Sequence, residues 1–71
     1  MRIGAFAEKY NMNVSAVRYY VERGLLTPQR RNNQYVFDDD CMKDMEKILR
    51  YKSFYFSLSE IELLFFLQRN S

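Results

Sequence analysis

Apolar residues in the first 24 positions recur at intervals of three and four, the spacing of one face of an α-helix. Over residues 3–10 these positions are Ile3, Phe6, Ala7 and Tyr10. In the next segment they are Val14, Val17 and Val21. Asn13 can cap this second helix with its side chain, and Gly24 can end it in a left-handed conformation. Two helices joined by a tight turn predict a helix-turn-helix over residues 3–24.

Residues 27–37 lack helical spacing and predict a short β-hairpin, which we call the wing. Pro28 disfavours the helical conformation of Thr27, so the chain enters this segment extended. Asn32 and Asn33 tolerate the positive φ of a tight hairpin turn. A plain loop is the alternative. The preceding pair, Leu25-Leu26, is expected to be buried.

Two further helices are predicted over residues 39–52 and 58–68. Asp38-Asp39-Asp40 can open the first, because carboxylates suit the positive end of the helix dipole. Its shared face is predicted to hold Met42, Met45, Ile48, Leu49 and Lys52. Ser57-Leu58-Ser59-Glu60 is a capping box for the last helix, and Phe56 can pack on Ile61 as a hydrophobic staple. The predicted fold class is mostly α: a winged helix-turn-helix of four helices with a small two-stranded β wing.

The last helix contains five consecutive apolar residues, and a helix turns its side chains through every direction in about 3.6 residues. The core can accept Leu58, Ile61, Leu64 and Phe65. Leu63, Phe66 or Leu67 is then expected to point outward. Because a contiguous apolar patch usually marks an interface, we expect a partner or a concentration-dependent dimer.

Composition limits the chemistry that the chain can perform. The 71 residues suffice for one domain, and no apolar run reaches the ~18 residues of a membrane span. The chain has no histidine, and Cys41 is its one cysteine, which excludes the usual Cys/His zinc sites and imidazole-based catalysis. We therefore expect no cofactor, no metal, no enzymatic activity and no membrane association, in a cytoplasmic protein.

Basic side chains concentrate in the first half of the chain. Residues 1–37 hold six basic and two acidic side chains, against five and seven in residues 38–71. This asymmetry favours a polyanionic partner for the first half, although a solvated face would give the same distribution.

The second helix has an outward face opposite its valines. That face holds Ser15, Arg18, Tyr19 and Glu22. A hydroxyl, a guanidinium and a phenol suit the phosphate oxygens and base edges of a DNA major groove. The alternative is an ordinary solvated face on which Arg18 pairs with Glu22. In the wing, Arg30, Arg31 and Asn32 can lie along a DNA backbone, or the arginines can merely protect an exposed strand edge.

These residues resemble the N-terminal domain of the mercury-resistance regulator (MerR) family. That family opens approximately with I-G-x-[LF]-A, V-x-x-x-[IV]-R-Y-Y-E and G-L-L. The matching residues are Ile3-Gly4, Ala7, Met12, Val17-Arg18-Tyr19-Tyr20 and Gly24-Leu25-Leu26. Further on, the family reads Y-D-E-x-D, I, L-G-F-S-L-x-E-I and L-L. The corresponding residues are Phe37-Asp38-Asp39-Asp40, Ile48, Phe54-Tyr55-Phe56-Ser57-Leu58-Ser59-Glu60-Ile61 and Leu63-Leu64.

The resemblance implies a bacterial transcription regulator that binds double-stranded promoter DNA as a homodimer. Such a regulator distorts the promoter and so acts on RNA polymerase indirectly. Arg18 and Tyr19 would lie in or beside the major groove, and Tyr20 would bridge the helix to the wing or touch a phosphate. Arg30, Arg31 and Tyr35 would serve the wing, and Lys52 a weaker second backbone contact. The family's effector and dimerisation regions are expected to be absent from these 71 residues.

The chain departs from the family pattern at three positions. The wing reads Gln34-Tyr35-Val36 where the family has G-Y-R, whose arginine grips a phosphate. Val21 replaces an acid, and Tyr55 replaces a glycine. Val36 and Tyr55 favour an alternative function, an interaction or accessory domain that keeps the fold but binds DNA weakly.

Overall fold

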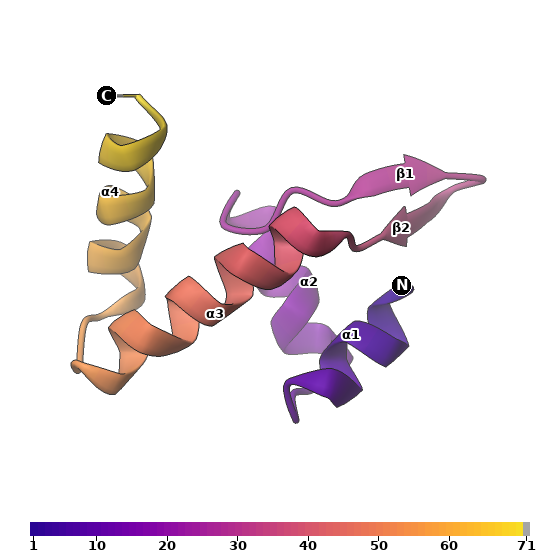
Figure 1. The fold of residues 1–71 in the computed structure, drawn as a ribbon, viewed down its shortest axis with the longest axis horizontal. Helices are drawn as coiled ribbons and strands as arrows, with labels where there is room; N and C mark the ends of the chain where they lie inside the picture. Colours follow the sequence, from indigo (N-terminus) through magenta and orange to yellow (C-terminus); the bar gives the residue numbers. More distant parts are fainter. Residues whose placement is uncertain (71) are drawn as a thin grey trace.

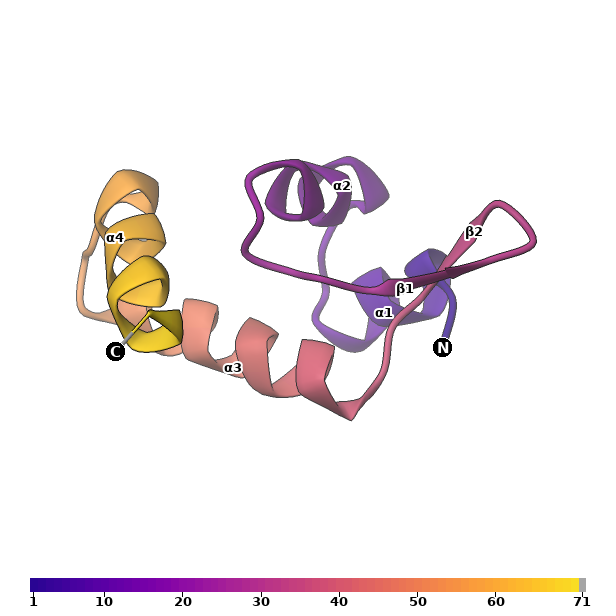
Figure 2. The ribbon, with the colours of Figure 1, turned by 90° about the horizontal axis from the view of Figure 1, so that it is seen from above.

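The computed structural model describes residues 1–70 and contains four helices and one hairpin (Figure 1). The elements are, in chain order, α1 (Ile3–Lys9), α2 (Val14–Glu22), β1 (Gln29–Arg31), β2 (Gln34–Val36), α3 (Asp39–Ser53) and α4 (Leu58–Arg69). The wing and α4 lie at opposite ends of the molecule, with α3 running between them (Figures 1 and 2). The predicted winged helix-turn-helix is confirmed, and α3 and α4 begin at the predicted residues and end one residue later than predicted.

Three helices end in the same way, with a residue in the left-handed conformation. After α2 this residue is Gly24, with φ +79°, as predicted. Its amide donates to the Val21 carbonyl, and the next amide, that of Leu25, donates to Tyr20. This pair of bonds defines a Schellman motif. Asn11 (φ 54°) and Tyr55 (φ 66°) occupy the same position after α1 and α3.

The starts of the helices use different caps. Asn13 stands at the N-cap of α2, but its side chain accepts no hydrogen bond, so that detail of the prediction is wrong. Its backbone carbonyl instead accepts from the amides of Ala16 and Val17. The Asp38 side chain accepts from the Cys41 amide at the start of α3. The capping box of α4 is confirmed in both directions.

One core joins all the helices and the base of the wing. Its buried members are Phe6, Ala7, Val17, Tyr20, Leu25, Leu26, Phe37, Cys41, Met45, Ile48, Ile61 and Phe65. The face predicted for α3 is only partly correct. Met45 and Ile48 are buried and Met42 is half-buried, but Leu49 is 41% exposed and Lys52 is exposed. The buried face is instead centred on Cys41, Met45 and Ile48, at i, i+4 and i+7, and Leu49 lies beside it.

The wing is a true hairpin, so the plain-loop alternative is wrong. β1 and β2 pair antiparallel, with Arg30 opposite Tyr35. Asn32 and Asn33 both have positive φ, 51° and 62°, as a two-residue type I′ turn requires. Phe37, at the base of the wing, is buried and stacks on Phe6 of α1 with ring centroids 4.5 Å apart.

Two arginines fasten α4 to the end of α2. Arg69 donates to the carbonyl oxygens of Gly24 (2.6 Å) and Leu25 (3.0 Å). Arg23 forms an ion pair with Glu62 at 2.8 Å, and hydrogen bonding to this carboxylate raises the pKa of Arg23.

The outward side of α4 is apolar, as expected. Ile61 and Phe65 are buried, and Leu58 and Leu64 are half-buried. Leu63, Phe66 and Leu67 are 57%, 59% and 54% exposed. We call these three residues the α4 patch. In the part of the chain described, no helix is both long and apolar enough to cross a bilayer.

Candidate nucleic-acid interface

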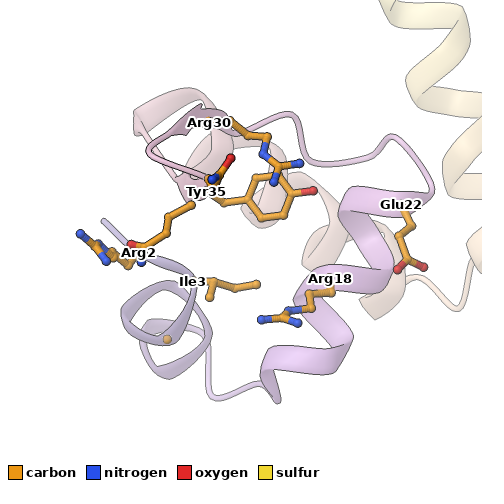
Figure 3. Close-up of a pocket in the computed structure, with 9 residues that line it drawn as sticks. Arg2, Ile3, Arg18, Glu22, Arg30 and Tyr35 are labelled. Atoms are coloured by element: carbon orange, nitrogen blue, oxygen red, sulfur yellow. The ribbon is translucent and has the colours of Figure 1, made fainter.

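An open hollow of about 600 Å³ lies where the start of α1, the outward face of α2 and the wing meet (Figure 3). We call it the arginine hollow, because Arg2, Arg18 and Arg30 all line it. Tyr35 and Glu22 are among its other lining residues. Two predicted DNA-binding elements, α2 and the wing, therefore border a single concave surface.

The helix-turn-helix fold turns Arg18 toward this hollow. Val17 is fully buried, which fixes the rotation of α2 and leaves Ser15 and Arg18 exposed and Tyr19 45% exposed. Within residues 1–70 the Arg18 guanidinium has neither a hydrogen bond nor an ion pair. Figure 3 shows the Arg18 and Glu22 side chains pointing in different directions. The Arg18–Glu22 ion pair of the solvated-face alternative does not form.

In the wing, the side chains of Arg30 and Tyr35 contact each other. They face each other across the two strands, and the Arg30 guanidinium lies 5.2 Å from the centroid of the Tyr35 ring. Cation–π contact of this kind restrains the guanidinium while leaving its N–H donors available. Arg31 and Asn32 are exposed beyond the hollow. Because side chains alternate along a strand, Arg31 faces the side of the wing opposite to Arg30.

Tyr20 is far more deeply buried than its neighbour Tyr19, although both line the same small cavity. It is only 7% exposed, and its hydroxyl accepts a hydrogen bond from the Lys52 ammonium at 3.2 Å. The bridge that Tyr20 makes therefore runs from α2 to the end of α3, and not to the wing. Lys52 and Phe56 also line this cavity, which is apolar and has a volume of about 240 Å³. The Lys52 ammonium thus lies beside α2 and is not among the residues that line the arginine hollow.

Arg2 is the one arginine of the hollow that was not among the predicted DNA-binding residues. The other lining residues that were not predicted as DNA-binding are Ile3, Gly4, Glu22, Asn33 and Gln34. Arg2 precedes the first helix and belongs to no periodic pattern, so no local signal assigns it a place. Arg2 is the N-cap residue of α1, and its neighbour Met1 is hydrogen-bonded to Phe37, 36 residues away in the chain.

The MerR helix-turn-helix family of regulatory proteins matches residues 1–65 of this chain. The chain belongs to the MerR family. It is also 32% identical over 73 residues to a protein named HTH-type transcriptional regulator ZntR homolog from Haemophilus influenzae. That comparison covers 100% of this chain and 54% of the relative, so the chain spans about half the length of the protein it matches. No solved structure matches the chain.

As a member of the MerR family, this chain is a DNA-binding domain of the kind found in transcription regulators. The observed winged helix-turn-helix agrees with this family membership. The arginine hollow lies between the two elements that define such a domain, the helix α2 and the wing.

Proposed function

We propose that this MerR-family domain binds double-stranded promoter DNA sequence-specifically, with α2 in the major groove and the wing on the sugar–phosphate backbone. The observation that carries the proposal is the arginine hollow, where α2 and the wing present Arg18 and Arg30 to one open surface. An unpaired guanidinium can bind a guanine edge or a phosphate with two parallel hydrogen bonds.

The remaining predicted contacts divide into specific and positioning ones. Ser15, Arg18 and Tyr19 are exposed on α2 and would reach base edges or nearby phosphates. Arg30, Arg31, Asn32 and Tyr35 would hold the wing on the backbone. Lys52, beside α2 and outside the arginine hollow, would supply a second backbone contact while bonded to Tyr20.

Salt dependence of DNA binding tests the proposal. If each domain neutralises roughly three phosphates, log K should fall with log salt at a slope of about −2.7. The probe is a duplex selected by the chain from a random-sequence library. Binding without any salt dependence would contradict the proposal and favour the interaction-domain alternative.

Arg18→Ala tests which face of α2 reads the DNA. This variant should lose its preference for the selected duplex and keep the melting temperature of the parent chain. Arg18 is exposed, and no other described residue has it as a hydrogen-bond or ion-pair partner. Lys43→Ala is the matched control: it removes an exposed cation from α3, away from the arginine hollow, and should bind as the parent does. Unchanged specificity in Arg18→Ala would place the recognition surface elsewhere.

We further propose that the domain acts as a homodimer and influences RNA polymerase through the promoter it distorts. The α4 patch supports self-association, because it exposes three large apolar side chains on one helix. A second copy bound to the α4 patch would lie at the end of the molecule opposite the wing (Figure 1). The wing of each copy would then stay free to bind DNA. Sedimentation should show a dimer that forms with rising concentration and is lost in Leu67→Glu. A parent chain that stays monomeric at high concentration would exclude dimerisation through this patch.

A further inference from the structure

The start of the chain is fixed to the base of the wing by two reciprocal backbone hydrogen bonds. The Met1 amine donates to the Phe37 carbonyl and the Phe37 amide donates to the Met1 carbonyl, both at 2.7 Å. Phe37 is itself buried and stacked on Phe6. The backbone beside Arg2 is therefore hydrogen-bonded both to α1 and to the base of the wing.

The Arg2 side chain has no partner within residues 1–70. It is exposed and forms neither a hydrogen bond nor an ion pair, yet it lines the arginine hollow with Arg18 and Arg30. The three guanidinium groups come from three separate segments, the start of the chain, α2 and β1 (Figure 3). Glu22 is the one carboxylate on the lining.

The three arginines on the lining outnumber its one carboxylate, so the hollow carries a net positive charge that attracts a polyanion. The hollow is not enclosed, so its arginines suit successive phosphates of a strand rather than one small anion held from all sides. The strand β2, Gln34–Val36, carries no cation of its own, although the family pattern places an arginine at the position of Val36. Arg2 adds a cation from the segment that is hydrogen-bonded to the base of this strand.

We infer that Arg2 is a further phosphate-binding arginine of this domain and that the N-terminal segment is part of its DNA-binding surface. The inference rests on the proposed function and extends it to a residue outside both α2 and the wing. Arg2, Arg18 and Arg30 line one hollow that is bordered by the start of α1, by α2 and by the wing. Arg2 contributes affinity uniformly across sequences, because phosphate contacts position a protein without reading bases.

The test compares Arg2→Gln with Lys43→Gln, an equal loss of charge on α3 outside the hollow. Both variants and the parent chain are titrated with the library-selected duplex and with a non-selected duplex of equal length, over a series of salt concentrations. Arg2→Gln should bind both duplexes roughly tenfold more weakly. Its salt slope should be smaller than that of the parent by about 0.9, the value for one phosphate contact. Lys43→Gln should match the parent in both respects.

Arg2→Lys and Arg18→Ala complete the experiment. Arg2→Lys keeps the charge and should keep the parent's salt slope. All variants should melt with the parent, since the Met1–Phe37 bonds involve backbone atoms alone. If Arg2→Gln binds like Lys43→Gln while Arg18→Ala loses binding, Arg2 has no such role and the proposed function stands. If the parent itself binds neither duplex in a salt-dependent manner, the proposed function fails, and the inference fails with it.

Discussion

Replacing Tyr55 by glycine should stabilise this domain. Tyr55 follows the C-cap of α3 in a Schellman motif, with its own amide on the Lys52 carbonyl and the Phe56 amide on the Tyr51 carbonyl. The motif requires φ near +66° at this residue, a region where the Cβ of an L-residue crowds the backbone. Gly24 fills the equivalent position after α2 at φ +79°.

The size of the effect follows from two opposing terms. A left-handed conformation costs a bulky L-residue about 1–2 kcal/mol. Glycine removes that cost but adds backbone entropy to the unfolded chain, which offsets roughly 0.4–1 kcal/mol. Because the Tyr55 side chain is 95% exposed, its removal costs almost no packing. We expect Tyr55→Gly to raise the free energy of unfolding by about 0.5–1 kcal/mol, and Tm by about 2–8 °C for a domain of this size.

Thermal melts and urea unfolding of three variants measure this difference. Tyr55→Ala keeps the strained backbone and should change Tm little. Gly24→Ala introduces the strain into the matching motif, where an added Cβ meets no atom within 4 Å, so it should lose about 0.5–1 kcal/mol. The reasoning is refuted if Tyr55→Gly is no more stable than Tyr55→Ala, because the tyrosine would then be held by interactions that its exposure does not reveal.

Three further predictions concern the core and the caps. Val17→Ala should cost about 1–3 kcal/mol, because Val17 is fully buried, whereas Arg18→Ala should not change Tm; equal losses would mean that the faces of α2 are reversed. The hydrogen bond from the Cys41 amide lowers the pKa of Asp38 below its ordinary value of 3.8, so its stabilising contribution is present above pH 3.8 and is lost as pH falls through the folded pKa. Asp38→Asn keeps the cap but cannot titrate, so the Tm of this variant should fall less than that of the parent as pH is lowered. An equal fall in both proteins would show that Asp38 is not the source of the acid sensitivity. Burial raises the pKa of the Cys41 thiol, so alkylation at neutral pH should require unfolding; rapid labelling of the native chain would show that α3 opens locally.

Features whose chemistry is local could be predicted from the sequence. The capping box of Ser57 and Glu60 lies within one turn and forms as predicted. Asn32-Asn33 fits the two positive φ angles of the wing turn, and Gly24 the one at the end of α2. Each of these signals needs only neighbouring residues, so periodicity and turn chemistry sufficed to predict four helices, a wing and the exposed α4 patch.

Tertiary structure alone decided which side chains meet. Tyr19 and Tyr20 are adjacent in the chain, but packing against α3 buries Tyr20 and leaves its neighbour on the outward face. Arg2, at the N-cap of α1, meets Arg18 and Arg30 at the arginine hollow because α1, α2 and the wing pack together there. Long-range contacts of this kind depend on how the elements pack in three dimensions, and the spacing of residues along one chain carries no record of that packing.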